Sequence, residues 1–297
     1  MATPFQAIFE VLHAGVGLSL QDLGRRGWTR FGVPPGGAMD DHAARWANVL
    51  AGNRPEAPTL ELLLQGARLR ALARIEVAVT GATAATLAGG DPRGWGTFIL
   101  EPDQELRLPP SEGGVWTYLA VPGGFTDRRW FDSVSIFPRG GLGTPLAAGA
   151  ILERVMTSAM ASQAGVTRRW VHPSEQRDYL KPPALRIWPG PQWDLFDETA
   201  RASLLNQEWT LSPSSDRTGY RMTGASLGSA KGTIASEPVL PGSIQVPPDG
   251  LPIVTMRDGP TVGGYPKLAL IDPPHLSWLT QCRPGQRIRF VRAPGAR

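Results

Sequence analysis

The densest group of polar residues that could do chemistry lies between residues 234 and 272 of the 297-residue chain. Four of its hydrogen-bonding or charged side chains, Gln245, Asp258, Tyr265 and Lys267, could converge on one site. Gly263 and Gly264 leave the backbone bare, so a ligand or another strand can approach it closely. We predict that these groups fold back beside Arg217 and line a wet, charged hollow at a seam between two barrel-like halves of the chain.

The same segment contains a turn that supports a second interpretation. Residues 247–250 read Pro-Pro-Asp-Gly, in which proline fixes φ, aspartate bonds its own backbone and glycine accepts a positive φ. Two strands should therefore flank the turn. The polar residues could then serve a plain β-hairpin by satisfying its buried turns, and both interpretations stay open.

A second polar segment lies near the N-terminus. Gln21–Arg25 precede the glycine-rich stretch of residues 32–40, which runs into a predicted helix. Free backbone N–H groups at such a helix start can hold an anion. The stretch lacks the Gly-Lys-Ser/Thr of a nucleotide-binding loop and the dinucleotide fingerprint, and a simple helix cap is the competing interpretation.

Other catalytic chemistries are poorly supported. The chain has 4 histidines without zinc-site spacing, so no metal ligands can be assigned. It has 1 cysteine, Cys282, which is expected to be a small core residue because no histidine stands beside it.

Composition indicates a folded, β-rich chain. Hydrophobic residues make up 41% and charged residues 19%, and 35 glycines with 29 prolines predict many tight turns. The net charge of +4 is not gathered into long basic runs, so no nucleic-acid partner is predicted. No signal peptide and no apolar run of about 18 residues is visible, so we expect a cytoplasmic protein without a membrane partner.

Strand patterns outnumber helix patterns, and the predicted fold is mainly β with a few helices. The predicted strands are residues 74–80, 115–121, 185–188 and 287–291. One helix is expected from about Asp40 to Leu50, with an aspartate cap at its start and Gly52 after its end. The other is expected from about Glu198 to Asn206, capped by Asp197.

An internal repeat divides the chain. Asp22 to Trp28 resembles Asp216 to Tyr220, and Glu61 and Glu237 each stand five residues before a glycine. Residues 103–108 similarly resemble residues 285–290. We predict two related β-barrel-like halves, 1–108 and 185–297, with 109–184 as a connecting segment and the helix at about 40–51 as an insertion in the first half.

The motifs together resemble the biotin-dependent carboxyltransferase or allophanate hydrolase subunit 2 family, which includes KipA-like proteins and the C subunits of 5-oxoprolinase. Those motifs are Gln21–Arg25, Gly37–Asp40, Ala47-Asn48, Gly52-Asn53, Thr80–Ala82, Gly190–Trp193, Ser215–Arg217, Pro241–Gly250 and Gly263–Pro266. The resemblance covers nearly the whole chain. It implies two cyclophilin-like β-barrel halves.

The resemblance also implies function and partners. Members work with a subunit 1, which is KipI-like or the B subunit of a 5-oxoprolinase, and 5-oxoprolinase adds an A subunit of the LamB/YcsF type. ATP, with Mg²⁺, then drives opening of 5-oxoproline, a small lactam, to glutamate. Two alternatives stay open: carboxyl transfer from carboxybiotin to urea or a related amide, and a KipA-like regulator that binds a KipI-like kinase inhibitor.

Residue types suggest roles for this hydrolase interpretation, since activating a lactam needs cations and proton carriers. The predicted catalytic residues are Arg217, Gln245, Asp258, Tyr265 and Lys267. The predicted substrate-binding or anion-binding residues are Asp22, Arg25, Glu61, Arg221, Glu237, Gly263 and Gly264.

Overall fold

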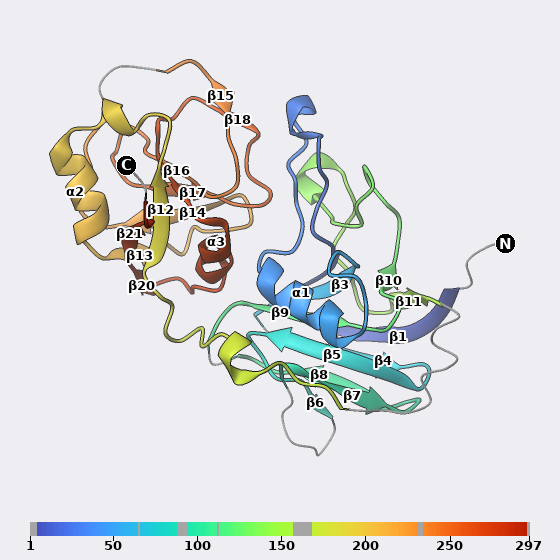
Figure 1. Ribbon diagram of the computed structural model, residues 1–297. Helices are drawn as coiled ribbons and strands as arrows, with labels where there is room; N and C mark the ends of the chain where they lie inside the picture. The colour runs from blue at the N-terminus through green and yellow to red at the C-terminus, as the bar shows by residue number, and fades with distance from the viewer. Residues whose placement is uncertain are drawn as a thin grey trace. The chain divides into compact units, whose positions relative to one another are not determined.

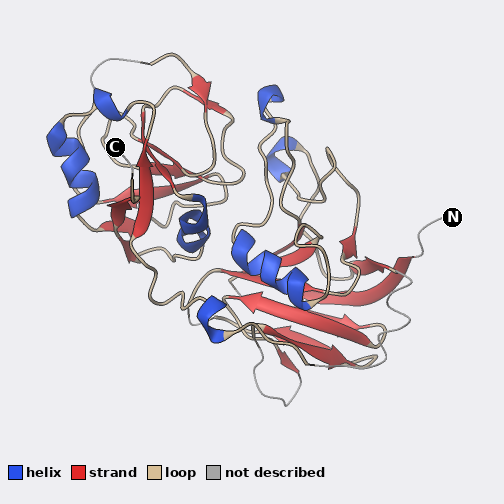
Figure 2. Cartoon of the chain, in the orientation of Figure 1, coloured by secondary structure: helices blue, strands red, loops and turns tan. Residues whose placement is uncertain are grey.

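The computed structural model describes residues 5–64, 66–87, 94–111, 113–156, 168–230 and 234–295. The chain divides into two compact units (Figure 1). Unit 1 comprises residues 1–25 and 36–180, and unit 2 comprises residues 26–35 and 181–297. Strands are the main element in both, as Figure 2 shows. None of the helices in the described ranges has the length and apolar character that a bilayer crossing requires.

Unit 1 is built from two antiparallel sheets. The five-stranded sheet has the order β2-β3-β9-β5-β7 and the six-stranded sheet the order β10-β11-β1-β4-β8-β6. The bounds are β1 Phe5–Ala14, β2 Gly17–Gln21, β3 Thr59–Leu63, β4 Ala67–Ala71, β5 Ile75–Gly81, β6 Thr86–Leu87, β7 Gly96–Leu100, β8 Glu105–Leu108, β9 Trp116–Ala120, β10 Phe125–Thr126 and β11 Ile151–Val155.

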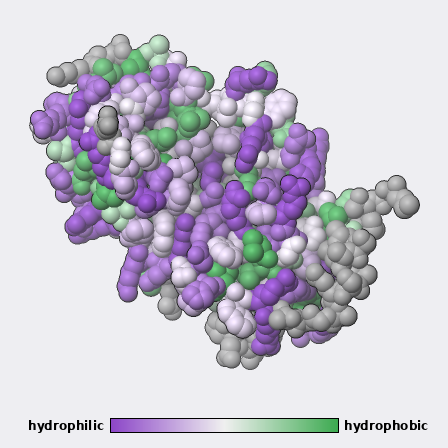
Figure 3. Space-filling view, viewed as in Figure 1, coloured by the Kyte–Doolittle hydropathy of each residue, from purple (hydrophilic) through white to green (hydrophobic). Residues whose placement is uncertain are grey.

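One apolar core joins these two sheets. Phe9, Val11 and Leu69 come from the six-stranded sheet and are fully buried. Leu60 and Val77 come from the five-stranded sheet and belong to the same buried cluster. Because alternate residues of a strand face one side of its sheet, each sheet supplies one apolar face to this core. Accordingly, the surface that Figure 3 presents is mostly hydrophilic, with small hydrophobic patches.

Helix α1 (Asp41–Leu50) is the predicted helix of unit 1, and it packs on β5 and β9. Asp40 caps its start by accepting a hydrogen bond from the Ala43 N–H at 3.1 Å. Gly52, at φ 73°, follows the helix end in the left-handed region, as predicted. Short 3-10 turns cover Pro138–Gly140 and Pro173–Glu175.

The large sheet of unit 2 has eight strands in the order β20-β13-β14-β17-β16-β19-β12-β21. The bounds are β12 Leu185–Pro189, β13 Trp209–Leu211, β14 Gly219–Thr223, β16 Ser243–Gln245, β17 Ile253–Thr255, β19 Lys267–Ile271, β20 Arg287–Ile288 and β21 Phe290–Arg292. Strands β20 and β21 lie at opposite edges of the order, yet only Arg289 separates them in the chain. The sheet therefore curls into a nearly closed barrel.

The remaining elements of unit 2 are short. Strands β15 (Glu237–Pro238) and β18 (Val262–Gly263) form a separate two-stranded sheet. The helices are α2 (Glu198–Asn206) and α3 (Pro273–Thr280), with 3-10 turns at Thr29–Phe31 and Trp193–Leu195. Helix α2 is capped by Asp197, which accepts from the Ala200 N–H at 2.8 Å.

The predicted fold class is confirmed as mainly β with a few helices. The predicted turn at 247–250 also forms: Gly250 has φ 73°, its N–H bonds the Pro247 carbonyl at 2.9 Å, and β16 pairs with β17 around it. Helix α3 was not predicted. It begins with two prolines, which suit a first helical turn but are usually interpreted as breakers.

Residues 109–184 were expected to connect the two halves, but unit 1 extends to residue 180 and much of this range belongs to its sheets. Strand β9 pairs with β3 and β5, and β11 pairs with β1. These strands are therefore parts of the sheets of unit 1, because their hydrogen bonds complete them. The relation between the halves by an internal repeat stays a prediction.

Candidate functional site

A buried lysine organises the polar residues of unit 2. Lys267 begins β19, and its ammonium donates a hydrogen bond to Glu237 Oε1. Gln192 Nε2 donates to the same oxygen at 2.7 Å, and Gln192 Oε1 accepts from the Lys267 N–H at 3.0 Å. The side-chain amide of Gln192 thus links the carboxylate of Glu237 to the backbone N–H of Lys267.

Gln245 lies next to Lys267, because β16 pairs with β19 in that register. It is buried, and its Nε2 donates to Thr255 Oγ1 at 2.7 Å. We call Lys267, Glu237, Gln192, Gln245 and Thr255 the Lys267 cluster. Its members come from β19, β15, β16, β17 and the turn after β12, so only the folded barrel assembles it.

Two glycines permit these close approaches. A Cβ on Gly190 would lie 2.3 Å from the Lys267 carbonyl oxygen, so only glycine lets the turn that carries Gln192 reach β19. A Cβ on Gly263 would lie 3.1 Å from Gln245 Oε1. The bare backbone predicted at Gly263 is therefore used by the protein's own Gln245. Gly264 is more open, since its Cβ would lie 3.5 Å from Ser236 Oγ.

Glu237 is the member of the cluster that solvent can reach. Its side chain is 35% exposed, against 6% for Lys267. The hydrogen bond from Lys267 lowers the pKa of Glu237 below its ordinary value, although partial burial opposes the shift. The carboxylate is therefore ionised near neutral pH and is held at one oxygen by an amide and an ammonium.

Arg217 and Asp258 form a separate ion pair in unit 2. Arg217 Nε donates to Asp258 Oδ2 at 2.7 Å, and Nη2 donates to Oδ1 at 3.2 Å. The Asp258 N–H also bonds the Arg217 carbonyl at 2.9 Å. This two-point geometry neutralises both groups, so their placement suits a structural clamp that fixes the turn after β17.

The two other residues predicted for unit 2 are exposed. Tyr265 is 47% exposed, two residues before Lys267 in the chain. Arg221 is exposed on β14, between the buried Tyr220 and Met222, so it points away from the barrel interior. The structure thus brings Lys267, Gln245, Glu237 and Gly263 together, while Arg221 lies outside the Lys267 cluster.

In unit 1, Asp22 is committed to its own loop. It is buried, and its Oδ1 accepts from Gly24 N–H at 2.8 Å, Ser133 Oγ at 2.6 Å and Ser135 Oγ at 2.7 Å. Its Oδ2 accepts from the Val134 N–H at 3.0 Å. A carboxylate with this many donors fixes a loop and has little capacity left for a substrate.

Arg25 is buried with Asp22 in the same region. Its guanidinium donates to the Ser135 carbonyl, and Nε donates to the Trp130 carbonyl at 3.3 Å. Only 2% of the residue is exposed, so an external anion does not reach it. Asp22 and Arg25 together hold residues 130–135 against the end of β2.

The glycine-rich turn before α1 already holds carboxylates of the protein itself. Glu61 is buried on β3, and its Oε2 accepts from the Met39 N–H at 2.8 Å and from the Tyr118 hydroxyl at 2.7 Å. The Tyr118 hydroxyl in turn accepts from the Asp40 N–H at 2.8 Å. The helix-cap interpretation therefore describes this segment.

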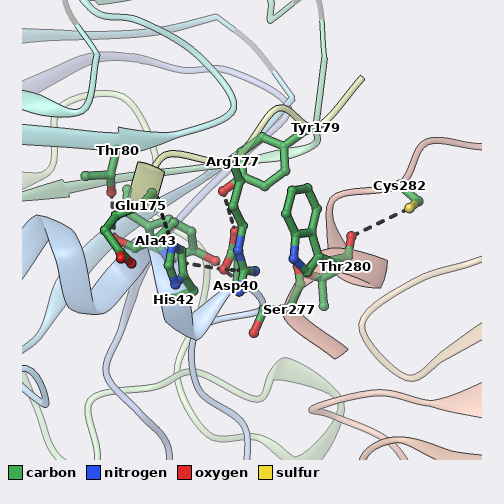
Figure 4. Close-up of polar contacts among 12 residues, drawn as sticks. Asp40, His42, Ala43, Thr80, Glu175, Arg177, Tyr179, Ser277, Thr280 and Cys282 are labelled. Carbon is green, nitrogen blue, oxygen red and sulfur yellow. Dashed lines mark hydrogen bonds and ion pairs between the residues drawn. The ribbon is translucent and has the colours of Figure 1, made fainter. Parts of the chain in front are cut away.

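Asp40 is the centre of the contacts in Figure 4. It accepts a hydrogen bond from the Tyr179 hydroxyl at 2.7 Å and lies 3.7 Å from the Arg177 guanidinium.

Two titratable groups near Asp40 have shifted pKa values. Burial, Glu61 and Asp40 raise the pKa of Tyr118, which stays protonated. Burial and then Arg177 lower the pKa of His42, whose Nε2 bonds the Glu175 carbonyl at 3.0 Å. A carbonyl only accepts, so this Nε2 carries the proton.

Sequence reasoning missed two members of the Lys267 cluster. Gln192 lies in the Gly190–Trp193 motif of the family resemblance, which could have suggested it. Thr255 ends β17 with no distinguishing pattern. No group of three or more histidine, cysteine, aspartate or glutamate side chains in the described ranges is arranged to hold a metal.

The fold belongs to a recognised class. Residues 31–292 match the family described as carboxyltransferase domain, subdomain A and B, and the chain belongs to this family. It is 33% identical over 289 residues to the C subunit of the 5-oxoprolinase of Haemophilus influenzae, covering 95% of this chain and 90% of that protein.

Solved structures agree with this membership. The structure of TTHA0988 superposes with a TM-score of 0.88 at 34% identity and covers 97% of this chain, which spans 56% of that longer chain. The urea carboxylase of Kluyveromyces lactis superposes with a TM-score of 0.85 at 26% identity. That match covers 98% of this chain and 28% of the urea carboxylase chain.

The Asp22 contacts give a stability prediction. Asp22→Ala leaves several buried donors without an acceptor, so we expect the free energy of unfolding to fall by about 3 to 5 kcal/mol. Urea unfolding followed by circular dichroism measures this change in the free energy of unfolding. Glu56→Gln is the control, since its ion pair with Arg54 is exposed and 3.8 Å long. A loss in Asp22→Ala as small as in the control would contradict the clamp.

The Glu237–Lys267 pair gives a pH prediction. The folded state lowers the pKa of Glu237 from 4.5, so the pair's stabilisation is present above that pH and is lost as the pH falls through the lowered value. The difference in unfolding free energy between wild type and Glu237→Gln should therefore shrink from about pH 7 to about pH 3. The same comparison made in a Lys267→Met background should be nearly flat, and an equal slope there would refute the pairing.

Cys282 gives a reactivity prediction. Burial raises the pKa of its thiol to about 12, and Sγ lies 3.6 Å from the Trp278 carbonyl oxygen. The folded protein should resist iodoacetamide at about pH 8, because the thiolate is the reactive form. Mass spectrometry should find alkylation only after denaturation in urea. Rapid labelling of the folded chain would be inconsistent with a core cysteine.

Proposed function

We propose that this chain is the C subunit of an ATP-dependent 5-oxoprolinase, which opens 5-oxoproline to L-glutamate together with two other subunits. The observation that carries the proposal is the similarity to the C subunit of the H. influenzae 5-oxoprolinase over 95% of this chain and 90% of that protein. The partners would be a KipI-like B subunit and a LamB/YcsF-type A subunit. The Lys267 cluster is the residue set through which we expect this chain to contribute.

The reaction needs activation because a lactam is a stable amide. ATP with Mg²⁺ would supply that activation in the complex by making the carbonyl oxygen part of a leaving group. Among the acidic residues of the predicted site, Asp22, Glu61 and Asp258 are unsuited to binding Mg²⁺. Asp22 and Glu61 are buried and bonded internally, and Asp258 is paired with Arg217. We therefore assign no phosphoryl-transfer step to the described residues of this chain.

Glu237 is the group best placed for proton transfer. Its Oε1 is held by Lys267 and Gln192, while Oε2 receives no hydrogen bond from the residues that the structure describes. Oε2 can therefore accept a proton from an attacking water molecule within hydrogen-bonding reach and return it to the lactam nitrogen as the C–N bond breaks. Lys267 keeps the carboxylate ionised, and Gln192 fixes its orientation.

The test is reconstitution of the three subunits and measurement of ADP release that depends on 5-oxoproline. Glu237→Gln should lower the rate about 10²- to 10⁴-fold, as expected for loss of a general base. Lys267→Met should lower it in the same direction by disordering Glu237. The matched control is Glu208→Gln, which removes an exposed carboxylate whose pKa is likewise lowered, by Arg289.

Two outcomes would count against the proposal in different ways. Absence of 5-oxoproline-dependent ADP release from the assembled wild-type complex would reject the reaction. Release that is equal in wild type, Glu237→Gln and the control would retain the reaction but remove the Lys267 cluster from it.

The similarity to urea carboxylase favours a second candidate function, carboxyl transfer from carboxybiotin to urea or a related amide. This candidate predicts loss of carboxyl label from carboxybiotin when the chain, its partner and urea are mixed. The same Glu237→Gln variant discriminates, because it should then slow transfer to urea and leave ADP release absent throughout.

A further inference from the structure

A cavity of about 410 Å³ lies in unit 1, within the segment of residues 127–150 that connects β10 to β11. This segment is light green in Figure 1. Polar groups at the cavity come from Asp127, Arg128 and Thr144, and apolar ones from Val134, Ile136 and Leu146. None of these residues belongs to the Lys267 cluster, so the cavity is a separate feature of the chain.

The apolar side of the cavity is anchored in the core of unit 1. Val134 is 2% exposed and belongs to the buried cluster between the sheets. Leu146 packs against that cluster, and its N–H bonds the Leu18 carbonyl of β2 at 2.8 Å. A floor fixed in this way keeps its shape without a ligand, which lowers the ordering cost of binding.

The loop is held in a strained shape by the buried residues at the end of β2. Phe131 and Asp132 both have positive φ, 53° and 64°, a conformation unfavourable for side-chain-bearing residues. Asp22 bonds Ser133, and Arg25 bonds the Trp130 carbonyl, on either side of this strained pair. Asp22 and Arg25 are therefore positioning residues for the cavity.

Arg128 is the cation among the residues that line the cavity. Its guanidinium carbon lies 4.0 Å from the centre of the Trp130 ring. Within the described part of the chain, that ring is the one partner found for its side chain. Stacking fixes the plane of a guanidinium while leaving its N–H donors at the edge, so they can take a carboxylate in a two-point contact.

Asp127 adds an acceptor beside this cation. Its Oδ1 accepts from the Arg128 N–H at 2.6 Å, which orients the carboxylate against the loop. A ligand N–H can bond such a carboxylate, whereas a polyphosphate would be repelled by it. One arginine also balances one carboxylate and not the several charges of a nucleotide.

We propose that this cavity binds a small molecule that carries a carboxylate and a neighbouring N–H on a compact apolar body. This is the class of α-amino acids and their cyclic or acylated amides. The carboxylate bonds Arg128, the N–H bonds Asp127, and the apolar body lies on Val134, Ile136 and Leu146. The proposal concerns binding by unit 1 alone and does not rest on the hydrolase function.

The test is calorimetric titration of the purified full chain, without partners or ATP. The probes are 5-oxoproline, 2-pyrrolidinone, which lacks the carboxylate, and cyclopentanecarboxylate, which lacks the N–H. We expect 5-oxoproline to bind and each partial analogue to bind about tenfold more weakly or less. Equal binding of cyclopentanecarboxylate would overturn the assignment to this class.

Variants locate the site. Arg128→Gln should weaken 5-oxoproline binding about 10- to 100-fold, and Asp127→Asn should weaken it in the same direction. Arg74→Gln is the matched control, since it removes one exposed cation of unit 1 that pairs with Glu101 at 3.1 Å. Thermal unfolding of each variant confirms that it folds like wild type.

Three results would overturn the proposal: no binding of 5-oxoproline at about 10 mM, equal affinity in Arg128→Gln and wild type, or an equal loss in Arg74→Gln. Failure here is distinguishable from failure of the hydrolase proposal. The hydrolase proposal is tested by ADP release from the complex and its Glu237 variant. The cavity proposal is tested by ligand binding to the single chain.

Discussion

A buried charge must be neutralised within the fold, and this constraint decides which polar residues of the chain remain available for chemistry. An unpaired ion in the interior costs several kcal/mol, and each buried acid or base among the described residues has a partner. Asp22 is surrounded by hydroxyl and backbone donors, and Asp258 is paired with Arg217. The buried acids among the predicted site residues are thus structural in the fold.

Glu237 and Arg128 differ from these residues because neither is buried. Glu237 is paired at one oxygen but partly exposed, so its carboxylate is both fixed and reachable. Arg128 is oriented by an aromatic ring and not by an acid, so its charge is not cancelled. Both groups are pre-oriented by neighbours that leave their hydrogen-bonding capacity partly unused, which is what a binding or catalytic group requires.

Local features of the fold could be predicted from the sequence because their causes are local. The caps at Asp40 and Asp197 and the turn ending at Gly250 depend on residues within a few positions of one another. Helix α3 escaped prediction because its first residues, Pro273 and Pro274, favour a helix start only when a following turn of helix is stabilised by packing.

The candidate site was predicted less completely, since its contacts join distant segments. Gln192 bonds Lys267 across 75 positions, and the approach depends on the missing side chain of Gly190. Gln245, Lys267 and Gly263 could be grouped in advance because they lie within one short segment around the turn. The pairing of each acid with its base could not be predicted, because it depends on strand register.

The pair Glu61 and Glu237 shows how one sequence feature acquires two roles. The sequence aligns them, each five residues before a glycine. In unit 1 helix α1 packs over β5 and β9, and Glu61 is buried near its N-terminus, bonded to Met39 and Tyr118. Glu237 instead meets an ammonium and an amide at the edge of the barrel and stays in contact with solvent. Glu61 therefore anchors helix α1, whereas Glu237 keeps one carboxylate oxygen that can exchange protons, and the proposed catalysis is placed in unit 2 for this reason.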